Sequence, residues 1–121
     1  MPRVVHFEVH AEDPQRAVAF YQAVFGWEFS KWGGPQDYWL VTTGEAPETG
    51  INGGIFRRKG PIGWVDTVQV DSVDAYAEKV VAAGGKVVVP KMPIPGIGWL
   101  VYCQDCEGSV FGMMQGDASA K

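Results

Sequence analysis

Basic residues, long apolar runs and cysteines are all scarce in this chain of 121 residues. Ten Lys and Arg residues against 14 Asp and Glu residues give a net charge of −4, and the basic residues cluster only at Arg57-Arg58-Lys59. No electrostatic footprint for nucleic acid stands out, so we do not expect DNA or RNA as the main partner. No run of about 18 apolar residues could cross a membrane, and the N-terminal residues lack the apolar region of a signal peptide. We therefore expect a cytoplasmic protein.

The two cysteines, Cys103 and Cys106, are spaced as Cys-x-x-Cys. This spacing supplies half of a four-thiolate zinc site, or a redox pair, and its simplest interpretation is a structural or incidental one. Because 46% of the residues are hydrophobic, one domain of this length can bury enough apolar surface to fold without disulfides.

The 16 glycines and eight prolines separate short apolar runs, which predicts many short elements joined by turns. In the first half, Asp13-Pro14 starts a helix that ends at Gly26. Its apolar positions are Ala17, Phe20, Tyr21 and Val24. The predicted strands of this half are Val4 to His10, Trp27 to Trp32, Tyr38 to Thr43 and Ile51 to Arg57.

The second half repeats the same order of elements. Ser72 starts a helix that ends at Gly84-Gly85 and carries apolar residues at Val73, Tyr76, Ala77, Val80 and Val81. Its predicted strands are Trp64 to Val70, Lys86 to Val89, Ile97 to Cys103 and Ser109 to Gln115. Val9 and Val68 lie 59 residues apart, as do Gly26 and Gly85.

The simplest account is an α+β domain over residues 1–121 that contains a duplicated βαβββ module. The first module spans 1–58, the second spans 62–116, and the boundary is Lys59-Gly60-Pro61. We expect the tail, residues 117–121, to fray.

Two sets of residues carry a resemblance to a known family. The first is His6-Phe7-Glu8-Val9, Asp13-Pro14, Phe20-Tyr21 and Phe25-Gly26-Trp27, and the second is the closing motif Asp105-Cys106-Glu107-Gly108-Ser109-Val110-Phe111-Gly112. With the duplication, they resemble the vicinal oxygen chelate superfamily, also called the glyoxalase, bleomycin resistance and dioxygenase family. The resemblance implies two tandem βαβββ modules forming a curved mixed sheet, or half-barrel, with a cleft.

The same resemblance implies a divalent metal in the cleft, held by ligands from the first and last strands of each module. His6 occupies the first of these four positions. The others fall on Val65, on Gly53 or Gly54, and on Gly112, none of which offers a donor. We therefore expect no metal and no other cofactor. A site rebuilt by His6 and Glu8, with Asn52, Gln69 or a partner subunit, stays open as an alternative.

Strand alternation places His6 and Glu8 on the cleft side, where they could form an acid–base pair. By the same alternation, Phe7, Val9, Phe111 and Met113 face the helices. The predicted ligand-binding residues are His6, Glu8, Trp39, Asn52, Trp64, Trp99, Tyr102, Gly112 and Met114. The apolar segment Lys91 to Gly98 is expected to cover the cleft or a subunit interface, or to be a packed connector.

Three function classes follow from these observations. The leading one is a protein that binds a small organic molecule without a metal. The second is a metal-dependent lyase, isomerase or dioxygenase of the same family, and the third is a dimeric interaction module without a small ligand. In each case we expect a homodimer, because half-barrels leave strand edges and apolar surface that pairing would cover.

Overall fold

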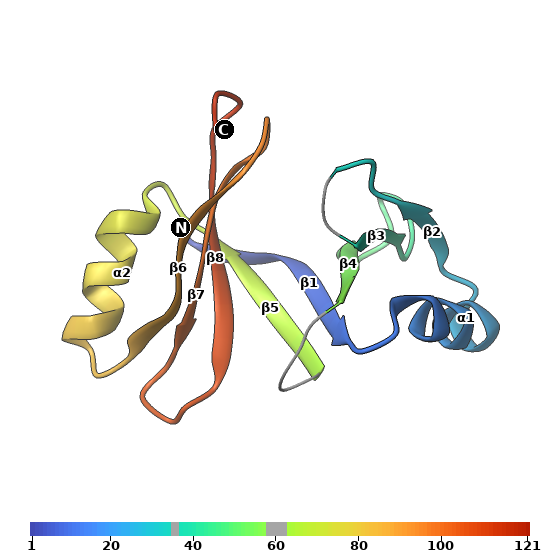
Figure 1. Cartoon of the computed structure of the whole chain (residues 1–121), viewed down its shortest axis with the longest axis horizontal. Coiled ribbons are helices and arrows are strands. Elements are labelled where there is room, and N and C mark those ends of the chain that lie inside the picture. Colours follow the sequence, from blue (N-terminus) through green and yellow to red (C-terminus); the bar gives the residue numbers. More distant parts are fainter. Residues whose placement is uncertain (35–36, 58–62) are drawn as a thin grey trace. The chain divides into compact units, whose positions relative to one another are not determined.

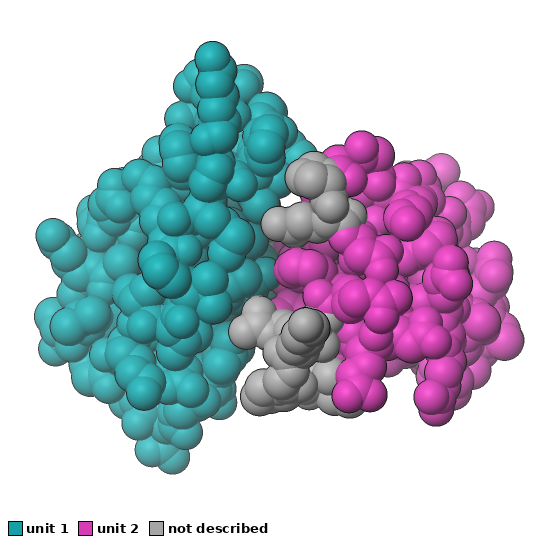
Figure 2. All heavy atoms as spheres, viewed as in Figure 1, with its two compact units in different colours: residues 1–5, 66–121 teal, residues 6–65 magenta. Residues whose placement is uncertain are grey.

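The computed structural model describes residues 1–34, 37–57 and 63–121. The chain divides into two compact units, which Figure 2 colours separately. Unit 2 is residues 6–65, and unit 1 combines residues 1–5 with 66–121. The predicted module boundary, Lys59-Gly60-Pro61, lies outside the described residues, as do Arg58 and Pro35.

The same order of elements occurs twice along the chain, as labelled in Figure 1, with most of the first set in unit 2 and most of the second set in unit 1. The first set is β1 (Arg3–Ala11), α1 (Pro14–Phe25), β2 (Glu28–Lys31), β3 (Tyr38–Thr42) and β4 (Gly53–Arg57). The second set is β5 (Gly63–Gln69), α2 (Val73–Ala82), β6 (Lys86–Ile94), β7 (Gly98–Gln104) and β8 (Val110–Gly116). The strands run β2-β3-β4-β1 in the first set and β6-β7-β8-β5 in the second, so the predicted duplication of a βαβββ module is confirmed.

Pairing directions also repeat between the two sets of strands. β1 pairs with β4 in parallel, and β5 pairs with β8 in parallel. The remaining neighbours, β2 with β3, β3 with β4, β6 with β7 and β7 with β8, are antiparallel. Each unit is therefore a small mixed sheet with one helix against one face.

Helix α1 begins and ends where the sequence predicts. The side chain of Asp13 accepts a hydrogen bond from the backbone N–H of Arg16, and Gly26 ends the helix in the left-handed conformation with φ of 71°. The predicted apolar face is confirmed in part, because Ala17 and Tyr21 pack on the sheet, together with Val18. Phe20 and Val24, by contrast, are 58% and 55% exposed.

The core of unit 2 lies between α1 and the sheet. Phe7, Val9, Val41 and Ile55 are buried there, which confirms that Phe7 and Val9 face the helix. The core of unit 1 is built in the same way from Val70, Val73, Val101, Cys103 and Met113. Cys103 is a buried core residue and Cys106 is exposed, and both are free thiols. Among the described helices, neither α1 nor α2 is long and apolar enough to cross a membrane.

Strand β6 corrects the interpretation of the segment after Val89. Residues Lys91 to Ile94 belong to this strand, and Met92, Pro93 and Ile94 pair with β7. The register shifts between Val87 and Val89 and again between Val89 and Met92. The second irregularity contains Pro90, whereas Pro93 lies in regular register opposite Trp99. Proline offers no N–H to a ladder and is tolerated at bulges and in edge strands such as β6.

The C-terminal tail is docked, so the prediction that it frays is wrong. The backbone N–H of Asp117 donates to the carbonyl of Ile97 over 2.9 Å, and that of Gly96 donates to the carbonyl of Ala120 over 3.0 Å. Ala120 is 3% exposed. The carboxylate of Asp117 adds further bonds, because it accepts from the N–H of Ser119 and from the indole of Trp99.

Candidate functional site

Strand β1 directs three polar side chains to the face of the unit 2 sheet that lies opposite α1. His6, Glu8 and His10 alternate with the core residues Phe7 and Val9. Glu8 and His10 are 5% and 4% exposed, and His6 is half-buried. Buried carboxyl and imidazole groups are costly unless they are hydrogen-bonded, so their partners define the chemistry of this face.

Strands β3 and β4 bring Tyr38 and Gly54 to the same face. Glu8 lies opposite Gly54 in the β1–β4 ladder, and Leu40 lies opposite Gly54 in the β3–β4 ladder. A Cβ built at Gly54 would overlap the hydroxyl and ring of Tyr38. The tyrosine therefore fills the room that a side chain at position 54 would need. Gly53 belongs to the opposite face, where a Cβ would overlap Phe7.

Hydrogen bonds join these groups into a polar cluster of His6, Glu8, His10 and Tyr38. Nε2 of His6 lies 2.9 Å from the hydroxyl of Tyr38. Nε2 of His10 donates to Oε1 of Glu8 over 2.9 Å. The negative charge of Glu8 also acts on the hydroxyl of Tyr38. The cluster thus contains the hydrogen-bonded pairs His6 with Tyr38 and Glu8 with His10, on one face of the sheet.

Burial governs the charge states in the polar cluster. Desolvation lowers the pKa of His6 below 6.5, and the negative charge of Glu8 opposes only part of this effect. Desolvation also raises the pKa of Tyr38 far above its usual value, and the negative charge of Glu8 adds to the rise. At neutral pH the cluster presents a neutral imidazole and a protonated phenol. It can accept or donate hydrogen bonds and can exchange a proton with a bound molecule.

The donors present do not fit the divalent metal that the family implies. His6 is the one donor at the four expected positions, and its Nε2 is engaged with Tyr38. Val65 is apolar, and Gly54, now placed in register with Glu8, has no side chain. Within residues 1–34, 37–57 and 63–121, no three His, Cys, Asp or Glu side chains gather where they could hold an ion.

Unit 1 brings Tyr102, Gly112 and Met114 onto one face of its sheet, as expected from strand alternation. Tyr102 lies opposite Gly112 in the β7–β8 ladder. A Cβ at Gly112 would lie 3.1 Å from Oγ1 of Thr67 and 3.5 Å from the ring of Tyr102. The buried hydroxyl of Thr67 is a polar feature that the sequence reasoning missed.

The three predicted tryptophan walls lie on the sides of their sheets that the helices cover. Trp39 and Trp99 lie on the helix-covered faces, packed against the cores of units 2 and 1 respectively. The ring of Trp64 stacks on Phe7 with 5.1 Å between centroids. Tyr38, next to Trp39 in sequence, is the aromatic residue of β3 that reaches the cluster, and the register with Gly54 is the signal that selects it.

Asn52 has a local structural role. Its Oδ1 accepts hydrogen bonds from the backbone N–H of Thr43 over 2.8 Å and from the hydroxyl of Thr43 over 3.3 Å. These bonds join the end of β3 to the start of β4, and they are exposed. Asn52 therefore supports the β3–β4 pairing and does not join the polar cluster.

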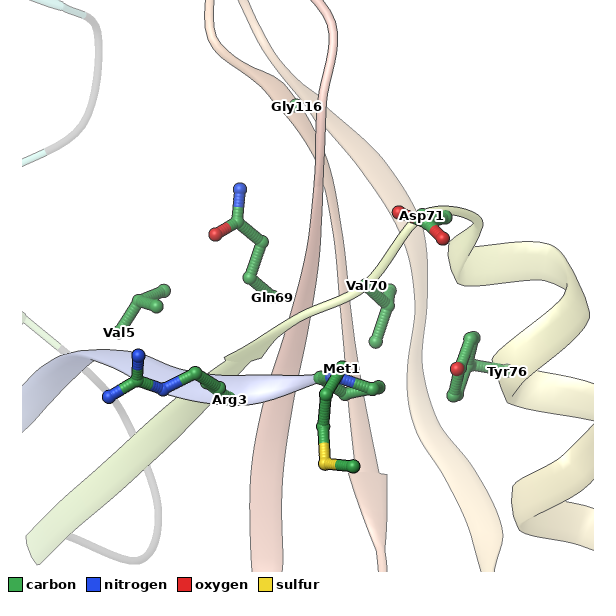
Figure 3. Close-up of a pocket in the computed structure, with 9 residues that line it drawn as sticks. Met1, Arg3, Val5, Gln69, Val70, Asp71, Tyr76 and Gly116 are labelled. Carbon is green, nitrogen blue, oxygen red and sulfur yellow. The ribbon is translucent and has the colours of Figure 1, made fainter.

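A separate hollow of about 500 Å³ lies in unit 1 (Figure 3). Its polar lining comes from Arg3, Gln69, Asp71 and Tyr76. Gln69, a candidate donor of the rebuilt metal site, lines it, and none of the predicted ligand-binding residues does. The charges of Arg3 and Asp71 have opposite sign, so the hollow offers no single charge preference.

Comparisons with known proteins agree with this architecture. The sequence profile of a family described as bleomycin resistance protein-like N-terminal matches residues 3–44. Curated proteins of Mycobacterium bovis and Mycobacterium tuberculosis, each named "Putative glyoxylase CFP32", are 31% identical to this chain over 118 residues. The match covers 89% of this chain and 42% of those proteins, so the chain spans about two fifths of their length.

Solved structures with the same fold cover almost the whole chain. A methylmalonyl-CoA epimerase in complex with methylmalonyl-CoA and NH4+ superposes with a TM-score of 0.69 at 17% identity, covering 100% of this chain and 99% of its own. A Streptomyces coelicolor methylmalonyl-CoA epimerase in complex with 2-nitronate-propionyl-CoA gives 0.68 at 17% identity, covering 98% and 97%. A hypothetical protein from Bacillus halodurans C-125 gives 0.69 at 9% identity, covering 99% and 98%. At these identities the likeness establishes the fold alone.

Proposed function

Because the chain belongs to the vicinal oxygen chelate superfamily, we propose that it binds a small organic molecule at the polar cluster of unit 2, without a catalytic metal ion. The observation that carries this proposal is the hydroxyl of Tyr38, which fills the space at Gly54 and pairs with Nε2 of His6. The side chain of Tyr38 thus contacts Nε2 of His6, the one donor retained at the four metal positions that the family implies.

The surroundings of the polar cluster favour an organic ligand. The ring of Phe56 lies 5.9 Å from those of His10 and Tyr38, and the ring of Trp32 lies 6.2 Å from that of Tyr38. Apolar surface next to a few fixed polar groups is the usual composition of a small-molecule site. The polar cluster would orient the ligand and the rings would contact its apolar part.

Metal analysis separates this proposal from a metal-dependent lyase, isomerase or dioxygenase. Protein purified without chelator should carry no stoichiometric Zn, Ni, Mn or Fe, and its melting temperature should be the same with and without EDTA. About one equivalent of metal per chain, lost together with stability in the His6→Ala variant, would overturn the metal-free proposal.

Ligand-dependent stabilisation distinguishes the proposed small-molecule binding from an interaction module that binds no small ligand. A compound that binds the native state raises the melting temperature by mass action. Methylmalonyl-CoA and 2-nitronate-propionyl-CoA, bound by the structural neighbours, belong in the first set of compounds. Compounds that stabilise the wild type and the exposed-site control Val81→Ala, and fail to stabilise His6→Ala, support binding at the polar cluster. Equal stabilisation of all three proteins would place the site elsewhere.

The homodimer and the cytoplasmic location stay predictions. Neither is needed for the proposed binding, which uses side chains of one unit of one chain.

A further inference from the structure

Helix α1 is apolar on its outward side, which faces away from the sheet, as well as on the side that packs on the sheet. Ala17, Val18 and Tyr21 pack against the core of unit 2. The outward side carries exposed apolar residues spaced as i, i+1, i+4 and i+5, namely Ala19, Phe20, Ala23 and Val24. A surface helix usually has polar residues on its outward side, and a helix that is apolar all round is usually covered on both sides. We therefore expect another surface to cover α1.

The duplicated module shows that the fold does not require an apolar outward side. The offset of 59 residues that relates the two modules also relates the first residues of α1 and α2. At this offset, Ala19 and Phe20 of α1 correspond to Glu78 and Lys79 of α2. Helix α2 packs on its own sheet with these charged residues in place. The apolar residues on the outward side of α1 are thus not needed for packing within a module.

Aromatic rings extend this apolar surface beyond the outward side of α1. The ring centroid of Tyr21 lies 5.2 Å from that of Phe20. It also lies 6.3 Å from that of Phe25 and 5.8 Å from that of Trp64. Phe20, Phe25 and Trp64 are 58%, 59% and 54% exposed. We call the exposed apolar residues of this surface the α1 patch: Ala19, Phe20, Ala23, Val24, Phe25 and Trp64.

The α1 patch has the size that an interface between two molecules needs. A buried aromatic side chain removes about 150–250 Å² from water, so at the exposures above the whole patch offers roughly 400 Å². Two such patches facing each other would bury about 800 Å², which is more than half of the roughly 1,200 Å² in the smallest stable interfaces. Polar side chains at the rim of the patch, such as the exposed Gln22, add to this area.

Shape and charge favour a second copy of this chain as the partner of the α1 patch. Ala19 and Ala23 are small and Phe20 is large, so in an antiparallel pair of α1 helices the ring of one copy can lie over the alanines of the other. Arg16 is the one charged residue of α1 and lies near its N-terminal end, and the last turn carries no basic residue. Antiparallel pairing brings Arg16 of each copy to the negative C-terminal end of the other helix.

We infer that the α1 patch is the interface through which two copies of this chain associate, with α1 packed antiparallel against α1 of the other copy. This inference goes beyond the proposed binding of a small molecule and does not depend on it. The polar cluster lies on the face of the unit 2 sheet opposite α1, so pairing through α1 does not use it.

The second module supplies the substitution that tests the interface. Phe20→Lys introduces the residue that α2 has at the corresponding position, at a site 58% exposed, so the variant should fold. Val81→Lys is the matched control, because Val81 is also 58% exposed but lies on α2. Sedimentation equilibrium should show dimers of the wild type and of Val81→Lys. The dissociation constant of the dimer should be at least about tenfold higher in Phe20→Lys, because two lysines then enter one apolar interface.

Two outcomes of this experiment would overturn the inference. The first is a wild type that stays monomeric up to submillimolar concentration. The second is a folded Phe20→Lys variant that dimerises as tightly as the wild type, since the interface would then lie on another surface.

A measurement on the wild type locates the interface even if Phe20→Lys fails to fold. In a mixture of 13C-labelled and unlabelled chains, isotope-filtered NOE spectra detect only contacts between copies. We expect contacts from the ring of Phe20 to the methyl groups of Ala19 and Ala23. Contacts between copies that involve no residue of the α1 patch would contradict the inference.

Discussion

The hydroxyl of Tyr38 lies where the side chain of residue 54 would lie if that residue were not Gly54. The two residues come from neighbouring antiparallel strands, and the ladder places Gly54 opposite Leu40 on the face to which Tyr38 also belongs. Packing therefore requires glycine at this position, because any side chain would overlap Tyr38. The absence of a side chain at Gly54 leaves the space that the ring of Tyr38 occupies.

Substitution of Gly54 by alanine should destabilise the protein by about 1–3 kcal/mol, because the new Cβ would overlap the Tyr38 ring and hydroxyl. Gly54→Ala should destabilise the Tyr38→Ala variant by less than it destabilises the wild type, because the overlapping atoms are absent there. Urea unfolding of the two single variants and the double variant measures this coupling. Gly33→Ala is the matched control, because nothing lies within 4 Å of a Cβ built there. Additive effects would contradict the packing relationship.

Stability should fall as the pH drops below 6.5, because burial lowers the pKa of folded His6 from that value. The unfolded chain then takes up a proton that the folded chain does not, which favours unfolding. Between about pH 7.5 and pH 5.5, the free energy of unfolding measured with urea should fall less in His6→Gln than in the wild type. Asp37 and Asp117 do not interfere in this window, because hydrogen bonds hold their pKa values below 3.8. If the unfolding free energy of His6→Gln depended on pH as strongly as that of the wild type, the prediction would be wrong.

Gly112→Leu should cost about 1–3 kcal/mol of stability, because Thr67 and Tyr102 are fully buried and leave little room for added volume. Thermal melting checks the folded state first. Gly116→Ala is the control on the same strand, with nothing within 4 Å of its Cβ, and should change stability by less than about 1 kcal/mol. A Gly112→Leu variant as stable as the wild type would show that this face of unit 1 has unfilled space.

We expect a homodimer in solution. The exposed aromatic residues Phe20 and Phe25 of α1 are 58% and 59% exposed, and burial of such apolar surface favours association. Light scattering at micromolar concentration should return about twice the chain mass of 13.2 kDa. A mass of one chain at all concentrations would exclude the dimer.

The sequence predicted the fold well because its local signals were strong and occurred twice. Asp13-Pro14 and Ser72 start helices as expected, and the 59-residue offset gave the duplication. The prediction from sequence was wrong where contacts between distant residues determine the structure. The tail after Gly116 looked free because the bonds that dock it run to Ile97 and Gly96 at the turn after β6.

The candidate site was predicted in part. Alternation along β1 is enough to group His6 with Glu8, since it needs no knowledge of other strands. The choice between Tyr38 and Trp39, and between Gly53 and Gly54, depends on the register of β3 with β4. A shift of one residue in that register exchanges the two faces, and single-sequence reasoning could not fix it.

The two prolines of β6 have a consequence for how copies of this chain can meet. β6 is the outermost strand of the unit 1 sheet, with β7 as its neighbour. An outer strand with regular spacing invites a strand of another molecule to pair with it, which leads to aggregation. Pro90 and Pro93 offer no N–H to such a strand, and the register shifts between Val87 and Met92 break the spacing of the remaining groups. The sheet of unit 1 is therefore protected from open-ended growth at this edge, and an ordered dimer would form through side chains on another surface.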